Sequence, residues 1–315
     1  MIEMLKTLGK SVREYKKSAL ITPVFVTAEV VLEVIIPLLM ADLIDKGIYT
    51  GEMNVILKIG LQLVLASILS LAFGCLSGIT ASKASAGFAK NLRQDLYYKV
   101  QEYSFSNIDK FSTASIITRL TTDVSNVQMA FQMLTRIVVR TPLMLVFSLI
   151  MAFNINSQLS LIFLGLIPIV GLALGLISTK AHPIFKRVFD KYDNLNNVVE
   201  ENVRGIRVVK TFGSEEREIK KFSDCSFRLA EISASNEKTW GLVFPPLEFF
   251  VGIGEFFVLY IGGRMVLADE MTLGELIQFV LFLGYIYQPL RWLSSLPRWL
   301  ARAMTSMVAV EMPLT

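Results

Sequence analysis

The sequence contains few of the residues that hold metals or form cross-links. Among 315 residues there are one His and two Cys, whereas a structural zinc site needs four Cys or His ligands. Two cysteines also give no disulfide framework. We therefore expect no metal site, and we expect Cys75 and Cys225 to be free thiols.

Charge is also scarce, and long apolar stretches take its place. Only 18% of the residues are charged, against about a quarter in an ordinary soluble domain, and 53% are hydrophobic. Apolar stretches of about 18 or more residues are typical of transmembrane helices. Six occur, at Ser18–Ile44, Val55–Ile79, Ile137–Phe153, Leu159–Ser178, Trp240–Tyr260 and Leu273–Leu293. The sequence therefore predicts an all-α membrane protein with six transmembrane helices, and the first stretch is too long for the core of a signal peptide.

The basic residues are strongly biased in their placement. All Lys and Arg residues except Lys46, Lys58 and Arg264 lie in the N-terminal tail, in segments 80–140 and 179–239, or after residue 290. Basic segments next to transmembrane helices stay in the cytoplasm. We therefore expect both termini and both long loops to be cytoplasmic.

The two long loops carry a helical repeat. Between residues 184 and 206, apolar residues recur every three or four positions, which indicates one continuous helical stripe. The first loop has a similar stripe at Phe88, Leu92, Leu96, Val100 and Tyr103. The transmembrane helices are thus expected to continue well beyond the membrane, since 25 helical residues extend about 40 Å.

A short segment marks the tip of the second loop. Gly205 and Gly213 bracket it, and glycine is common where a helix ends or turns. Within it Ile206, Val209 and Phe212 recur at a spacing of three residues and would form one apolar face. Such a short amphipathic helix at the end of a long hairpin suits contact with another protein.

Three segments, in order and at fitting spacing, resemble the transmembrane domain of bacterial multidrug-type ABC exporters of the six-helix half-transporter kind. "FSTASIITRLTTDVSNVQ" (111–128) is similar to the first intracellular loop of that family and "ENVRGIRVVKTFGSEEREIKKF" (201–222) to the second. "MTLGELIQFVLFLGYIYQPLRWLSSL" (271–296) is similar to the entry of its sixth helix. The resemblance covers nearly the whole chain and implies a multi-pass protein of the bacterial cell (inner) membrane.

The resemblance implies that both loop tips are coupling helices, which dock in grooves of nucleotide-binding domains. It places the first at Ser112–Thr121 and the second at Arg204–Phe212. The residues that it implicates are Ser112, Ile116, Arg119, Thr121 and Asp123 in the first, and Arg204, Gly205, Ile206, Val209, Lys210 and Phe212 in the second. The implied partners are a nucleotide-binding domain, a second half-transporter (identical or different) and the lipid bilayer.

The sequence offers no ATPase site. Neither the phosphate-binding motif G-x-x-x-x-G-K-[ST] nor a Leu-Ser-Gly-Gly signature occurs, and a nucleotide phosphate needs such a glycine-rich loop with its Lys. We expect no catalytic or cofactor-binding residue in this chain. By the resemblance, ATP and Mg would bind to a nucleotide-binding domain that is missing here, which favours a truncated protein over one whose ATPase lies on another chain.

The same comparison suggests a division of the chain. Residues 1–17, with apolar Leu5, Leu8 and Val12 among basic residues, are expected to form an elbow helix on the membrane surface. Residues 18–310 form the transmembrane domain, and residues 311–315 depart from the family pattern.

Charged residues inside the predicted membrane helices are candidates for the substrate pathway, because charge is costly in a bilayer. Glu29 and Glu33 lie on one face of the first helix, Glu248 and Glu255 on one face of the fifth, and Arg140 lies early in the third. An exporter of cationic amphiphiles would use carboxylates in this way. The alternative is that these groups pair with one another or face a wet cavity.

The function favoured by these features is the membrane-spanning half of an ATP-driven exporter of lipophilic or drug-like cargo. Two alternatives remain, a secondary transporter without ATPase and a truncated partner that regulates a complete half-transporter. Acidic residues interleave with the basic ones along the loops, which argues against binding of nucleic acid.

Overall fold

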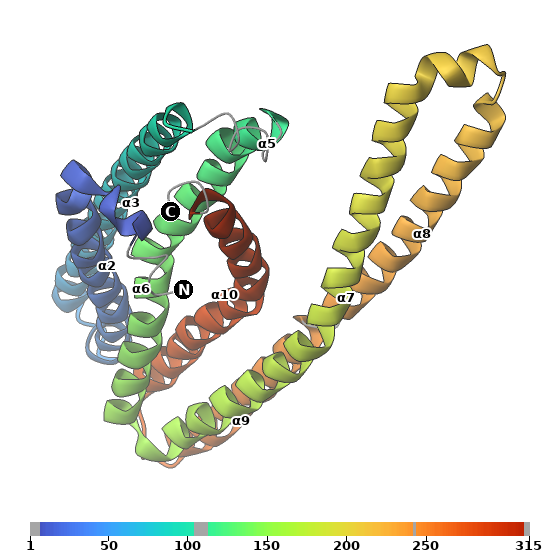
Figure 1. Ribbon diagram of the computed structural model, residues 1–315. Helices are drawn as coiled ribbons and strands as arrows, with labels where there is room; N and C mark the ends of the chain where they lie inside the picture. Colours follow the sequence, from blue (N-terminus) through green and yellow to red (C-terminus); the bar gives the residue numbers. More distant parts are fainter. Residues whose placement is uncertain (1–6, 104–112, 242–243, 312–315) are drawn as a thin grey trace. The chain divides into compact units, whose positions relative to one another are not determined.

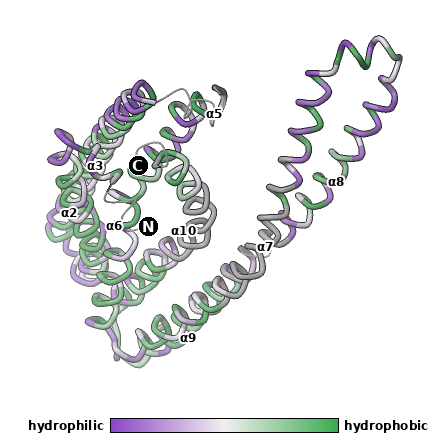
Figure 2. Tube along the Cα trace, in the orientation of Figure 1, coloured by the Kyte–Doolittle hydropathy of each residue, from purple (hydrophilic) through white to green (hydrophobic). Residues whose placement is uncertain are grey.

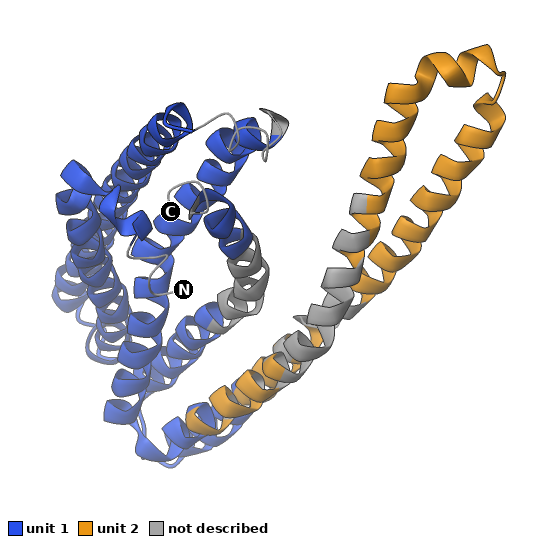
Figure 3. Ribbon diagram, viewed as in Figure 1, with its two compact units in different colours: residues 1–163, 255–315 blue, residues 164–254 orange. Residues whose placement is uncertain are grey.

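The structure is a computed structural model that describes residues 7–103, 113–241 and 244–311. It does not describe the side chains of 290–302, of many residues between 166 and 193, or of residues 113, 114, 239, 240, 244, 247 and 311. Every element described in these ranges is helical, as the sequence predicts (Figure 1). The chain divides into two units (Figure 3), and each is considered by itself. Unit 1 contains residues 1–163 and 255–315, and unit 2 contains residues 164–254.

Four long helices build unit 1, namely α2 (Lys16–Asp42), α3 (Met53–Gln101), α6 (Val124–Ile155) and α10 (Leu273–Glu311). The buried residues of α2 recur every three or four positions and so lie on one face, the pattern of a helix packed along one side. In one core cluster, Val26, Val30 and Val34 of this face pack with Met144 of α6 and Phe282 of α10.

Four helical stretches are long and apolar enough to cross a membrane, rather than the predicted six, among the residues that the structure describes. They are Arg13–Ile48, Met53–Gln101, Ser115–Ile155 and Glu248–Leu267. They contain the first three predicted spans and the greater part of the fifth. The fourth and sixth predicted spans, Leu159–Ser178 and Leu273–Leu293, include residues whose side chains are outside the description, and their crossing of the membrane stays a prediction.

Helix α3 extends far beyond any bilayer. Its 49 residues measure roughly 70 Å at 1.5 Å per residue, against about 30 Å for a hydrocarbon core. In its second half Phe88, Leu92 and Leu96 are buried, which confirms the predicted stripe over these positions. They pack with Leu8 and Val12, which are therefore covered by protein. Residues 1–6 lie outside the described part, and the elbow helix on the membrane surface stays a prediction.

Unit 2 contains a long antiparallel hairpin, formed by the outer part of α7 (Ser157–Thr211) and by α8 (Glu215–Gly241) (Figure 1). Asn202 donates a hydrogen bond to Glu218 at 2.9 Å, and Lys221 donates one to Glu201 at 2.7 Å. Hydrophilic residues recur along both arms of the hairpin (Figure 2). The continuous helix predicted over residues 184–206 is confirmed.

The two glycines at the tip of this hairpin have different roles. Gly205 lies inside α7, which agrees with the continuous helix predicted through residue 206. The turn occurs at Gly213, whose φ of +60° is favourable for glycine, and Ser214 N–H donates to the carbonyl of Val209 at 3.0 Å. The expected coupling helix is thus the last part of α7, which bends at the tip (Figure 1).

A capping arrangement starts α10. Thr272 and Glu275 exchange hydrogen bonds between side chain and backbone N–H at 2.9 and 3.1 Å, which is a capping box. Asp45 accepts hydrogen bonds from the Thr272 hydroxyl at 2.6 Å and from Gly274 N–H at 2.9 Å. This carboxylate lies at the positive end of the helix dipole, and it joins the segment after α2 to α10.

Candidate functional site

An ion-pair cluster lies among the apolar residues of unit 1. Arg140 of α6 is 2.5 Å from Glu29 and 2.7 Å from Glu33, both on α2. Its second terminal nitrogen, Nη2, contacts both carboxylate oxygens of Glu33 at 2.7 Å. The side chain of Glu29 is 9% exposed, that of Glu33 22% and that of Arg140 27%. Three predicted pathway residues from two helices are thus brought together.

Helix α3 lies beside α2 and borders the ion-pair cluster. Ser77 of α3 donates a hydrogen bond to Glu29 at 3.3 Å. A methyl group added at Gly74 would lie 3.0 Å from a carboxylate oxygen of Glu29, and one added at Gly78 would lie 3.6 Å from a terminal nitrogen of Arg136. The two glycines are one helical turn apart, so these small residues leave room for a carboxylate and for a guanidinium beside α3.

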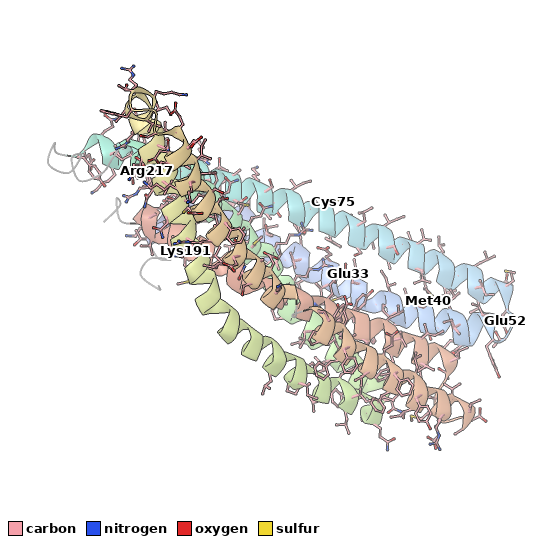
Figure 4. All side chains as sticks on the ribbon, turned by 90° about the vertical axis from the view of Figure 1, so that its right-hand side faces the viewer. Glu33, Met40, Glu52, Cys75, Lys191 and Arg217 are labelled. Carbon is pink, nitrogen blue, oxygen red and sulfur yellow. The ribbon has the colours of Figure 1, made fainter. Side chains whose placement is uncertain are left out.

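Two cavities open at this cluster. One of about 850 Å³ is lined by Glu29 and Glu33 together with Ser67, Ser70 and Cys75 of α3. Figure 4 shows Glu33 on α2 and Cys75 on α3. The other, of about 490 Å³, is lined by Arg140 and by Met133, Ile137 and Met144 of the same helix. Polar groups at an otherwise apolar cavity are the usual composition of a ligand site.

Arg136 is the residue that the sequence analysis missed. It lines both cavities, and it forms no ion pair with an acidic group in the part of the chain that the structure describes. It precedes Arg140 by four residues and therefore shares its helix face. That spacing was visible in the sequence, where Arg136 was counted only among the basic residues of the loop.

The two remaining carboxylates predicted for the substrate pathway are Glu248 and Glu255. Both side chains are exposed, and neither lies within ion-pair distance of a basic group among the described residues. Glu248 belongs to unit 2 and Glu255 to unit 1. Their contact with cargo stays a prediction.

The first predicted coupling segment and the residues that follow it form hydrogen bonds with two helices. Its described part consists of α5 (Thr113–Thr118) and the π-helical turn Arg119–Asp123, whereas Ser112 lies outside the described residues. From α3, Arg93 donates to the carbonyl of Leu120 at 3.3 Å and to the hydroxyl of Ser125 at 3.1 Å. From α10, Ser306 donates to Asp123 at 2.8 Å. Hydrogen bonds therefore connect this part of the chain to both helices.

The second predicted coupling segment presents apolar side chains at the hairpin tip. Ile206 is 45% exposed and Phe212 is 77% exposed, and Val209 is half-buried. Arg204 pairs with Glu200 at 2.5 Å and Lys210 with Glu215 at 3.4 Å. The pKa of Glu215 is lowered, first by its own backbone N–H at the start of α8 and then by Lys210. Exposed apolar side chains framed by ion pairs suit the surface of a protein contact.

Residues 20–290 match the ABC transporter transmembrane region. This chain belongs to that family. The matched residues include α3, α6, most of α2, the first part of α10 and the hairpin of unit 2. The match also makes the Glu29–Arg140–Glu33 cluster a feature of a transport domain.

The similar proteins are longer than this chain. An uncharacterized ABC transporter ATP-binding protein of Bacillus subtilis (strain 168), YfiB, is 28% identical over 268 residues, which are 85% of this chain and 47% of that protein. An ATP-dependent lipid A-core flippase of Pseudomonas syringae pv. syringae is 26% identical over 250 residues, 78% of this chain and 41% of the flippase. This ABC transmembrane region therefore spans about half the length of the relatives that it matches.

Proposed function

We propose that this chain lines the translocation pathway of an ATP-driven exporter, working as one half of a dimer with nucleotide-binding domains. Its membrane helices number six and its termini are cytoplasmic. The cargo is lipophilic and enters the cavities beside Glu29, Arg136 and Arg140. The observation that carries the proposal is the pairing of two features, a charged cluster at cavities among apolar helices and a long hairpin with an exposed apolar tip.

The charged cluster supports the pathway. Charges within membrane helices are costly and face the bundle interior or a water-filled cavity. Here the charges line cavities whose remaining walls are largely apolar, which suits an amphiphilic cargo. The name of the flippase relative points to a lipid for that protein, and a lipid-like cargo agrees with these walls.

The hairpin supports the coupling role. Its apolar face consists of Ile206 and Phe212, which are exposed, and Val209, which is half-buried. An apolar face of this size at a helix end is suited to a groove on another protein. We assign the segment Arg204–Phe212 to the contact with a nucleotide-binding domain, and α5 with the turn that follows it to a second such contact.

The test is a charge on this face in the intact transporter. Val209→Asp is expected to reduce both cargo-stimulated ATPase and ATP-dependent transport by about tenfold or more, because a carboxylate buried in an apolar contact without a partner is strongly unfavourable. Ile219→Asp is the matched control, since its side chain is 66% exposed and lies on α8, outside the assigned segment. Transport in liposomes by both variants at the unmodified rate would contradict the coupling assignment.

Measurements on the same transporter preparation distinguish the proposed exporter from a secondary transporter and from a regulatory partner. Flux driven by an ion gradient without ATP would favour a secondary transporter. Co-purification with a complete half-transporter, accompanied by loss of that transporter's activity, would favour a regulatory partner. ATP-dependent transport that needs this chain supports the proposal.

A further inference from the structure

The charged side chains around the larger cavity are not all matched by a partner of opposite charge among the described residues. Two carboxylates, Glu29 and Glu33, share the single guanidinium of Arg140, so this group carries one excess negative charge. Arg136 lines the same cavity and has no acidic partner in the described ranges of the chain, so it contributes one positive charge. The cavity thus holds one unbalanced charge of each sign.

The two unbalanced charges are separated along α3. Gly74 marks the level of Glu29 and Gly78 marks the level of Arg136, as the close approaches of these side chains to the two glycines show. Four residues of α-helix correspond to about 6 Å along the axis. The negative and positive groups therefore lie about one helical turn apart along one wall.

The carboxylates also retain acceptor capacity. One oxygen of Glu29 receives only the hydroxyl of Ser77, at 3.3 Å, and each oxygen of Glu33 takes one hydrogen bond from Arg140, within the described part of the protein. Two carboxylates offer about eight lone-pair positions in total. An ammonium group, with its three donors, can therefore bind here without displacing Arg140.

We propose that this cavity binds the headgroup of a zwitterionic amphiphile. Its anionic group pairs with Arg136 and its amine with the carboxylates of Glu29 and Glu33, while Ile36, Leu71 and Ile79 contact its apolar chain. A ligand with a charge of one sign only would leave the opposite protein charge unbalanced among apolar helices, which is costly. A phosphodiester and an amine joined by a two-carbon linker have about the required spacing. This inference rests on the proposed function and names the class of its cargo.

The native thiol of Cys75 provides the measurement, because it is exposed and lines the cavity. In the full chain with Cys225→Ser, in an uncharged detergent, the rate of maleimide labelling of Cys75 is followed against three probes of equal chain length. They are lauroyl lysophosphatidylethanolamine (zwitterion), lauroyl lysophosphatidylglycerol (anion) and dodecylamine (cation). The zwitterion is expected to protect Cys75 at about tenfold lower concentration than either other probe, since it alone forms both charge-assisted contacts.

Single variants assign each contact. Arg136→Gln should weaken protection by the zwitterion and the anion about tenfold and leave the cation unchanged, and Arg136→Lys should retain most of the protection. Glu33→Gln should weaken the zwitterion and the cation but not the anion. Lys58→Gln is the control, because it removes an exposed charge from α3, the helix that carries Cys75, and should change nothing.

Three results would overturn the proposal. They are equal protection by all three probes, no protection by the zwitterion, or an Arg136→Gln variant that behaves like Lys58→Gln while Arg136→Lys is also unchanged. The measurement needs no ATP and no second domain. If the probes protect Cys75 equally but the whole transporter still shows ATP-dependent transport, the zwitterionic cargo is rejected and the proposed function is retained. If the zwitterion protects selectively but ATP-dependent transport is absent, the proposed function is rejected and the zwitterion-binding cavity is retained.

Discussion

The hydroxyl of Ser306 donates a hydrogen bond to the carboxylate of Asp123 at 2.8 Å, although the two residues are 183 positions apart. Asn126 in turn donates to the Ser306 hydroxyl at 3.0 Å. Ser306 is 3% exposed, and the contact is partly buried between α10 and the turn Arg119–Asp123. It gives the end of α10 a direct connection to the segment that follows α5.

Removal of this hydroxyl should loosen the connection. Ser306→Ala leaves Asp123 and Asn126 each without one partner, which is expected to cost about 1–2 kcal/mol of the free energy of unfolding. The measurement is the apparent unfolding temperature of the chain in detergent. Ser82→Ala, at an exposed position of α3, is the control and should have little effect; equal effects of the two variants would show that the Ser306–Asp123 hydrogen bond contributes nothing.

The Glu29–Arg140–Glu33 cluster should depend strongly on its cation. Arg140→Met leaves the nearly buried carboxylate of Glu29 unpaired and is expected to destabilise the chain by about 3–5 kcal/mol. Arg136→Met is the control and should cost much less, because Arg136 has no acidic partner among the described residues.

A triple variant makes this test sharper. Adding Glu29→Gln and Glu33→Gln to Arg140→Met removes all three charges together and should recover much of the lost stability. Thermal unfolding of the three proteins provides the comparison. A triple variant as unstable as Arg140→Met would mean that packing of the Arg140 side chain, rather than charge, stabilises the site.

Gly87 should be required for docking of the N-terminal segment. A methyl group at this position would lie 2.4 Å from the ring of Tyr15, too close for any side chain. Gly87→Ala is therefore expected to displace Tyr15 and to raise the rate of proteolysis of the N-terminal segment. Gly60→Ala on the same helix meets nothing within 4 Å and should stabilise slightly, since Ala is the better helix former. Equal protection of both variants from protease would contradict this contact.

The hairpin of unit 2 should lose the Glu201–Lys221 ion pair at low pH. The pKa of Glu201 is lowered from its ordinary value of 4.5, chiefly by the hydrogen bond from Lys221, and the pKa of Lys221 is raised from 10.5 for the same reason. The carboxylate's contribution is complete above pH 4.5 and is lost as the pH falls through the lowered pKa. The contribution of Lys221 is complete below pH 10.5 and is lost as the pH rises through its raised value.

Carbon NMR of the Glu201 carboxyl would measure this directly. Lys221→Met should raise the Glu201 titration midpoint toward its ordinary value, whereas Lys220→Met, beside it on α8, should leave the midpoint in place. A midpoint that does not respond to Lys221→Met would mean that the ion pair is not formed in solution. The effect on stability should be small, because both groups are exposed to solvent and salt.

The sequence by itself determined the helical class, most of the membrane helices and the long extensions. Apolar runs and three-to-four-residue repeats are local patterns, and each is decided by the need of one helix to bury one face. The stripe at Phe88, Leu92 and Leu96 could be found in this way. Of the two glycines that bracket the predicted tip, Gly205 lies inside α7, because a single glycine costs only about 1 kcal/mol inside a helix and does not by itself end one.

The tertiary structure decided which side chains of distant helices contact one another. The sequence placed Glu29, Glu33 and Arg140 on two helices but did not say that they meet, because contact between distant helices depends on the packing of whole faces. Nor could it give Arg136 a position beside Gly78, or join Ser306 to Asp123. Pairwise contacts leave no periodic trace in a single sequence, and only the packed bundle shows which charged side chains pair.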